Sequence, residues 1–212
     1  MKLSPARFNA FLRHMGQNAA WRRARACPCR DGYSGAARPD CAQCRGKGWQ
    51  WSAETAVHLA LTGAQRQRQW AQMGMYEAGD VVITLPGDDA AYAIGPMDRL
   101  VLTDSSDAFS TTLVRGVDDT AWPVLVVSLE RVFYLNAQQQ AVECALPTLT
   151  GRTATWPASP AVVPPAGQRY SVTGRKRPEY FVWGDLVQTR HHHDGLNLPR
   201  HVVLRRFDLF GR

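Results

Sequence analysis

Residues 79–89 read Gly79-Asp80-Val81-Val82-Ile83-Thr84-Leu85-Pro86-Gly87-Asp88-Asp89 and contain the clearest strand of this 212-residue chain. A run of apolar and β-branched residues stands between a Gly-Asp opening and a Pro-Gly-Asp-Asp turn. This composition is typical of a short strand and the turn that ends it. Because similar stretches recur along the chain, we predict a protein that is mainly β.

The other predicted strands are short and are separated by links rich in glycine and aspartate. They cover residues 56–62, 99–103, 110–114, 123–127, 131–135, 169–173, 180–183 and 201–207. Such a rhythm favours a small β-barrel or sandwich over a sheet of alternating strands and helices. Residues 65–76 fit either a helix or a strand, because their aromatic and charged residues satisfy both periods.

The chain begins with the pattern of an amphipathic helix. Ser4 is a suitable N-cap and Pro5 suits the first helical position. An apolar stripe follows at spacings of three and four, formed by Phe8, Phe11, Leu12 and Met15. We expect the stripe to dock on protein; the alternative is a helix that binds a membrane surface or nucleic acid.

Three regions are predicted. Residues 1–52 form the helix and a cysteine-rich module, residues 53–156 form the β-barrel body, and residues 157–212 form a connector and an extended β-rich C-terminal arm. Proline is concentrated in residues 157–168, which predicts an extended, semi-rigid connector.

Charge is distributed unevenly over a net value of +7. Residues 1–50 carry ten Lys or Arg and two Asp, residues 51–168 six Arg and twelve acids, and residues 169–212 nine basic residues and four acids. Basic ends on an acidic middle are expected to meet nucleic acid or the acidic middle of a neighbouring copy. The sequence has no apolar run long enough for a transmembrane helix and no signal-peptide pattern at its start, so we expect a cytoplasmic protein without membrane contact.

Four cysteines, Cys27, Cys29, Cys41 and Cys44, have the spacing C-x-C-x11-C-x2-C. Two close pairs joined by a loop match a tetrahedral zinc site, in which each pair supplies two corners. Two disulfides or an iron–sulfur site are the alternatives; a reducing compartment and the short C-x-C spacing disfavour disulfides. With four cysteines the coordination shell is closed, so the predicted zinc is structural and not catalytic.

Basic residues surround the cysteines. Arg22, Arg23, Arg25, Arg45 and Lys47 are candidates for contact with nucleic acid or a protein partner. Their charge also offsets the formal negative charge of a zinc ion bound to four thiolates.

Catalytic motifs are missing from the sequence: it has no G-x-S-x-G, no phosphate-binding loop and no H-E-x-x-H. The pairs Asp88-Asp89 and Asp118-Asp119 are interpreted as turn formers, and a nuclease that uses them is the remote alternative. His191-His192-His193 is interpreted as a surface loop and Cys144 as a small buried hydrophobe. We therefore expect no enzyme.

The assembled pattern resembles the head-completion and neck proteins of tailed bacteriophages. The features that carry the resemblance are the cysteine module with Gly46, Gly48 and Trp49, the strand openings at Gly79-Asp80 and Asp98-Arg99, and the motifs of the tail around Arg177-Pro178-Glu179-Tyr180 and Leu198-Pro199-Arg200-His201. The resemblance implies a virion protein that is made in the bacterial cytoplasm. It further implies a homo-oligomeric ring that joins portal or adaptor proteins to tail proteins around the DNA channel. A zinc-ribbon protein that binds nucleic acid is the alternative function.

Overall fold

The computed structural model describes residues 4–62, 64–186 and 192–210 and divides the chain into two compact units. Unit 1 consists of Met1–Asp104 and Glu179–Arg212, and unit 2 is the continuous segment Ser105–Pro178. Unit 2 is therefore an insertion into unit 1, and each unit has its own hydrophobic core.

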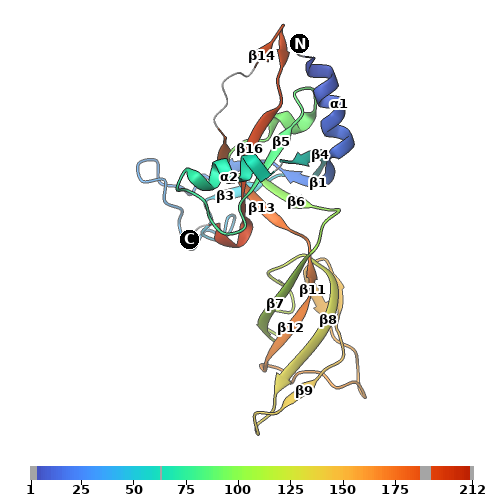
Figure 1. Cartoon of the computed structure of the whole chain (residues 1–212). Helices are drawn as coiled ribbons and strands as arrows, with labels where there is room; N and C mark the ends of the chain where they lie inside the picture. The colour runs from blue at the N-terminus through green and yellow to red at the C-terminus, as the bar shows by residue number, and fades with distance from the viewer. Residues whose placement is uncertain (1–3, 63, 187–191, 211–212) are drawn as a thin grey trace. The chain divides into compact units, whose positions relative to one another are not determined.

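Unit 1 is built on a closed six-stranded barrel in which every neighbouring pair is antiparallel (Figure 1). The order around the barrel is β1 (Gln17–Arg22), β4 (Thr55–Leu61), β5 (Val81–Leu85), β16 (Arg200–Arg206), β13 (Glu179–Asp185) and β6 (Arg99–Leu102), which returns to β1. Because the barrel is closed, each of its strands is hydrogen-bonded to a neighbour on both sides, and the barrel has no edge strand.

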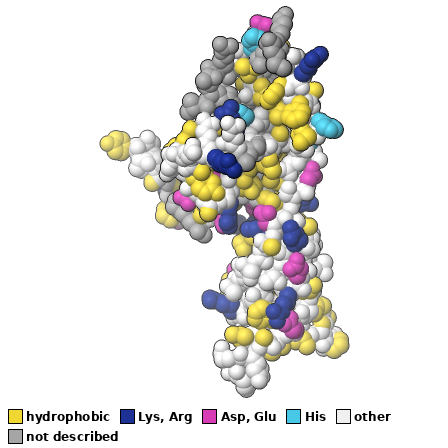
Figure 2. All heavy atoms as spheres, in the orientation of Figure 1, with side chains coloured by type: hydrophobic (Ala, Val, Ile, Leu, Met, Phe, Trp, Pro, Cys, Tyr) yellow, Lys and Arg dark blue, Asp and Glu magenta, His cyan; other side chains and the backbone are white. Residues whose placement is uncertain are grey.

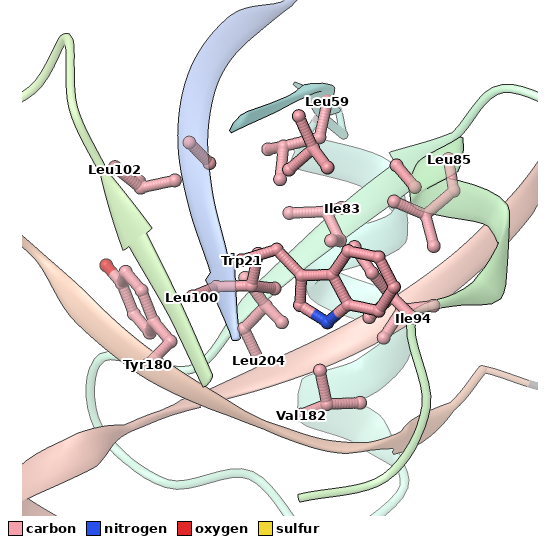
Figure 3. Close-up of a cluster of buried hydrophobic side chains, with 14 residues drawn as sticks. Trp21, Leu59, Ile83, Leu85, Ile94, Leu100, Leu102, Tyr180, Val182 and Leu204 are labelled. Carbon is pink, nitrogen blue, oxygen red and sulfur yellow. The ribbon is translucent and has the colours of Figure 1, made fainter. Parts of the chain in front are cut away.

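The barrel is filled by aliphatic side chains around one indole. Figure 3 shows Trp21 among Ile83, Ile94 and Leu204. Residues of β5 are buried almost without alternation, because a second cluster covers its outer face. That cluster is formed by Trp70, Val82, Leu186 and Val203.

Residues 64–72 form helix α2 (Ala64–Gln72), which resolves the ambiguity left by their sequence. The helix packs on β5 through Trp70, whose Nε1 donates a hydrogen bond to Asp80 Oδ2 at 2.9 Å. Asp80 also forms a buried ion pair with Arg205 at 3.0 Å. Tertiary packing of the indole therefore decides between the two periods.

The N-terminal helix α1 (Pro5–Met15) is present as predicted, but its apolar stripe is mostly exposed. The residues it buries are Pro5, Asn9 and Leu12, and Asn9 Oδ1 accepts a hydrogen bond from the N–H of Gly87 at 3.2 Å. Exposed fractions are 50% for Phe8, 56% for Phe11 and 63% for Met15. Within one chain, Leu12 is therefore the member of the predicted stripe that is buried, and polar bonds on a neighbouring face help to orient the helix.

Figure 2 shows hydrophobic side chains beside basic and histidine side chains where Figure 1 draws α1. Arg13 on this helix forms an ion pair with Asp88 at 2.6 Å, and its carbonyl lies 2.9 Å from His58 Nε2. Neither helix of the described chain has the length and apolar character that crossing a membrane requires.

Unit 2 contains a four-stranded sheet in the order β7 (Asp107–Val114), β12 (Arg169–Lys176), β8 (Val126–Leu135) and β9 (Ala141–Glu143). A separate hairpin joins β10 (Thr148–Thr150) to β11 (Thr153–Thr155). The core of the unit is formed by Leu113, Trp122, Val132, Ala154, Tyr170 and Val172. The remaining short elements are β2 (Ala24–Ala26), β3 (Trp49–Trp51), η1 (Ala90–Ala93), β14 (His192–His193), β15 (Leu196–Asn197) and η2 (Phe207–Leu209).

The mainly β fold with a barrel and an N-terminal helix is confirmed, while the boundaries of the units differ from the predicted 1–52, 53–156 and 157–212. Strands from all three predicted regions close the barrel, so β13 and β16 are strands of the barrel and do not form an extended arm. Residues 157–168 lie inside unit 2, where Ala145 N donates to Val162 O at 2.8 Å, and they do not link two domains. The two strands predicted at 123–127 and 131–135 are one strand, β8, with irregular pairing.

Candidate metal centre

The four cysteines predicted as ligands lie together. All four Sγ atoms are within 4.8 Å of one another. The Sγ atoms of Cys27 and Cys41 are 3.8 Å apart, and those of Cys29 and Cys44 are 3.4 Å apart. A disulfide requires about 2.05 Å, and all four cysteines are free. The cluster is therefore able to hold a metal ion.

A hairpin that continues the barrel carries this cluster. Strands β1 and β4 pair as far as Trp21 and Thr55, and β2 and β3 continue the pairing from Ala24 and Trp51. The N–H of Cys27 donates to Gly48 O at 2.9 Å, which closes the hairpin over the loop that contains the other three cysteines. The barrel thus fixes the two ends of a 20-residue loop, and the sulfur cluster lies within it.

Tight turns place the second cysteine pair. Arg45 N donates to Cys41 O at 2.8 Å and Lys47 N donates to Cys44 O at 3.0 Å. Gly48 has a φ of +72°, and a Cβ on it would lie 3.1 Å from Ala37 Cβ. The glycine is required here both by its left-handed backbone and by this close approach.

Thiol acidity differs within the cluster. The backbone N–H groups of Cys44 and Gln43 stabilise the thiolate of Cys41 and lower its pKa from 9.0 to about 6. Desolvation raises the pKa of Cys29 to about 12. The protein therefore favours the thiolate of Cys41, whereas the thiolate of Cys29 needs a bound cation to offset its desolvation.

Asp98, a buried residue that the sequence analysis did not single out as part of a site, attaches the hairpin to the barrel. Its carboxylate accepts hydrogen bonds from Trp21 Nε1 at 2.7 Å, from Ala24 N at 2.6 Å and from Gly95 N at 2.9 Å. Trp51 on the other hairpin strand donates through Nε1 to Met97 O at 3.0 Å. The turn before β6 therefore holds both strands of the hairpin. An aspartate directly after Gly95-Pro96-Met97 was the available signal in the sequence.

The predicted basic contact residues have different surroundings. Arg22 is paired with Glu54 at 2.6 Å, and the guanidinium of Arg23 lies 5.8 Å from the ring centroid of Trp21. Arg25 and Arg45 are exposed. Lys47 Nζ lies 4.9 Å from the ring centroid of Phe207. The five residues thus do not form one uniform basic patch, and Arg23, Arg25 and Arg45 are the members with exposed side chains for which no ion pair is seen in the described chain.

An aromatic cluster beside the hairpin was missed by sequence reasoning. Trp51 makes edge contacts with Phe207 at 5.5 Å and Phe210 at 5.4 Å, and Phe210 contacts Phe181 at 5.0 Å. Phe181 and Phe210 of this cluster also line a pocket of about 370 Å³, together with Lys47, Trp49 and Trp183. The turn η2 therefore packs on the hairpin that carries the cysteines. Local sequence patterns do not reveal this contact, because Trp51 and Phe207 are far apart in the sequence.

Within the described residues, the aspartate pairs, the histidine run and Cys144 do not come together in a site. Asp89 Oδ1 accepts a hydrogen bond from Ala91 N at 2.8 Å and caps η1, while Asp118 Oδ2 accepts one from Val114 N at 2.6 Å. The two aspartate pairs belong to different units. His192 and His193 form β14, whereas His191 lies outside the described residues. Cys144 is half-buried, and desolvation raises the pKa of its thiol.

Comparison with known proteins gave no match: no family model fits the chain, and no curated protein is significantly similar to it.

Proposed function

We propose that the four cysteines bind one zinc ion and that its role is structural. A tetrahedron with zinc–sulfur bonds of about 2.3 Å has sulfur–sulfur edges of about 3.8 Å, and the observed separations of 3.4 and 3.8 Å lie close to this value. Cys27 and Cys44 are buried, as expected for ligands of a closed site. Bound zinc would replace the hydrophobic core that the loop between β2 and β3 is too small to build.

The content of metal tests this assignment directly. Chain purified without added chelator should contain about one zinc per chain by elemental analysis, and Cys41→Ser should lower this content strongly. Cys144→Ser is the matched control, since Cys144 belongs to unit 2 and not to the cluster. Purified chain that binds iron in place of zinc, or no metal, contradicts the proposal.

For the whole protein we propose a structural role in a virion, as a ring-forming subunit of the neck that joins the portal and tail of a tailed bacteriophage. The observation that supports an assembly role is the exposed apolar face of α1, formed by Phe8, Phe11 and Met15. Exposed apolar side chains that gather on one helix face are typical of a surface that another protein covers. The proposed role includes no catalytic step.

Charge supports contacts between copies. The first 50 residues are strongly basic and residues 51–168 are acidic. Opposite charges on two surfaces orient and speed association more than they strengthen it. In the proposed ring, the basic N-terminal region of one copy faces acidic residues of the next through a head-to-tail contact.

Assembly tests this role. Replacing Phe8 and Phe11 by serine should abolish ring formation and incorporation into particles, while the circular dichroism spectrum stays unchanged because both side chains are about half exposed. Ala10→Ser, at another exposed position of α1, is the control. Purified virions that lack the protein would overturn the proposal.

A second candidate function is nucleic-acid binding by the metal hairpin. The observation in its favour is the exposure of Arg23, Arg25 and Arg45 around the cysteines. Such binding should weaken steeply with salt, because phosphate contacts release counterions. Failure to bind duplex or single-stranded DNA at about 50 mM salt, or binding unchanged when the three arginines become glutamine, would exclude it.

A further inference from the structure

The sheet of unit 2 ends at β7, and the outer edge of this strand is open. Strand β12 is its neighbour on one side, and no strand of the described chain pairs with the other side. Among residues 107–114 only Asp107 is charged, and the strand contains no proline, glycine or lysine. Natural edge strands usually carry such residues, or bulges, to prevent pairing with another chain.

Hydrogen bonds at the end of β7 identify the backbone groups that point outward. Arg115 N donates to Gln168 O at 3.1 Å, and Gly167 N donates to Arg115 O at 3.0 Å, so the backbone of Arg115 faces the β12 side. Val114 therefore faces the open side, where its N–H donates to Asp118 Oδ2. Because backbone direction alternates along a strand, the N–H and C=O groups of Ala108, Ser110 and Thr112 also point outward. All three residues are exposed.

The opposite edge of the same sheet is protected. Strand β9 has three residues and covers β8 only from Phe133 to Leu135. The remainder of β8 shifts its register against β12 at two places, between Thr173 and Gly174 and between Arg175 and Lys176. Arg131 on β8 is also paired with Glu143 on β9. Bulges and charges of this kind prevent edge pairing, so β7 is the edge able to accept another strand.

We propose that β7 pairs antiparallel with β7 of a second copy, with Ser110 opposite Ser110 on a two-fold axis. The two ends of the strand determine this register. The N–H of Val114 is engaged by Asp118, and the carbonyl of Ser106 accepts from Arg175 Nη2 at 2.5 Å. The outward N–H and C=O groups of Ala108, Ser110 and Thr112 are left to bond to another strand. Pairing them symmetrically about Ser110 forms about six hydrogen bonds between the two chains.

The strand is complementary to itself, which is the reason for choosing a second copy as its partner. In this register Ala108 lies opposite Thr112, and Asp107 lies opposite Leu113, so no like charges meet. Ser110 faces its own copy, and Thr112 lies diagonal to it across the strands, where hydroxyl side chains are within reach of one another. The two-fold axis repeats each of the other contacts. The contact uses residues of unit 2 alone, concerns the free protein in solution, and does not depend on the zinc site or on the proposed neck function.

Size-exclusion chromatography with light scattering over a range of concentrations tests the proposal on the full chain. We expect a species with twice the 23.6 kDa mass of one chain. Ser110→Lys places two ammonium groups across the axis and should weaken dimerisation about tenfold or more. Ser110→Thr should preserve it, and Thr155→Lys, at an exposed site of β11, is the charge control.

Two further measurements test the register independently of the lysine variant. An equimolar mixture of Ser110→Lys and Ser110→Glu chains should recover the dimer, because opposite charges then face each other. Ser110→Cys should cross-link to itself under mild oxidation, since directly opposed hydrogen-bonded residues have Cα atoms about 5.5 Å apart, within the range of a disulfide. Thr112→Cys, which faces Ala108, should cross-link poorly, and the native chain gives the background of its own cysteines.

Several outcomes overturn the proposal. They are a monomer at every concentration, an oligomer whose mass Ser110→Lys does not change, and equal cross-linking of the Ser110→Cys and Thr112→Cys variants. A dimer that persists after zinc is removed by a chelator supports it. If the Ser110→Lys chain has an altered circular dichroism spectrum, the cross-linking comparison decides.

Discussion

Replacing Asp98 by alanine should destabilise unit 1 and release the metal hairpin. Asp98 is 3% exposed, and its carboxylate accepts three hydrogen bonds, from Trp21 Nε1, Ala24 N and Gly95 N. A buried donor that loses its acceptor costs about 1–3 kcal/mol. Because water can replace the carboxylate at some of these three donors, we expect the free energy of unfolding to fall by about 4 kcal/mol. Asp98→Asn keeps one acceptor oxygen and should lose about half as much.

Urea unfolding followed by far-UV circular dichroism and tryptophan fluorescence measures this loss. With a slope of about 2–3 kcal/mol per molar urea, a loss of about 4 kcal/mol should lower the urea midpoint of unit 1 by about 1.3–2 M. The two units need not unfold together, so the transition of unit 2 serves as an internal reference that should not move. Limited proteolysis should show faster cleavage between β2 and β3 in the variant.

Asp104→Ala is the matched control for this experiment. Asp104 also accepts a backbone hydrogen bond, from Asn18 N at 2.8 Å, but in an exposed position. Its loss should therefore cost about 1 kcal/mol or less. An Asp98→Ala chain no less stable than the Asp104→Ala chain would refute the conclusion that this buried carboxylate holds the hairpin to the barrel.

Three further predictions concern unit 1. Cys41→Ser or chelation should increase protease cleavage of the loop between β2 and β3 while the β-sheet signal of the barrel is retained; collapse of the whole circular dichroism spectrum would show instead that the metal site is part of the core. Arg205→Ala should lower the free energy of unfolding by about 3–5 kcal/mol, because it leaves Asp80 buried without its partner, and an unchanged urea midpoint would contradict this. Burial, and secondarily Arg66, lowers the pKa of His201 below 6.5. The stability contributed by its neutral ring is therefore present above pH 6.5 and is lost as the pH falls through the lower folded pKa. His201→Gln should flatten the decline in urea midpoint between about pH 7 and about pH 5, and an equally steep decline would assign it to other groups.

Local patterns were sufficient to predict the strand at Val81–Leu85 with its bounds and helix α1 at Pro5–Met15. Both have strong signals at their ends, the Gly-Asp and Pro-Gly pairs of the strand and the proline at the start of the helix. The cysteine cluster was predictable for the same reason, since the spacing of two pairs limits where the sulfur atoms can lie. These features depend on residues that are neighbours in the sequence.

Long-range pairing decides what the sequence did not predict. Residues 17–22 were not among the predicted strands, yet Ala19 and Trp21 face the barrel core and make β1 a strand of the barrel. The burial of Asn9 on α1 was not predicted, because it depends on a hydrogen bond between its side chain and Gly87, 78 residues away. Asp98 and the aromatic contacts of Phe207 and Phe210 likewise join distant segments, and a single sequence contains no record of such pairs.

The way the barrel closes determines the order in which the chain can fold during synthesis. Strand β16 lies between β5 and β13, so the barrel is incomplete until Arg206 has left the ribosome. Unit 2 is continuous and precedes this point by almost thirty residues, and domains generally fold as units during synthesis. Unit 2 should therefore fold first, while the barrel strands made earlier stay unpaired along the edge of β5 until β16 has been synthesised.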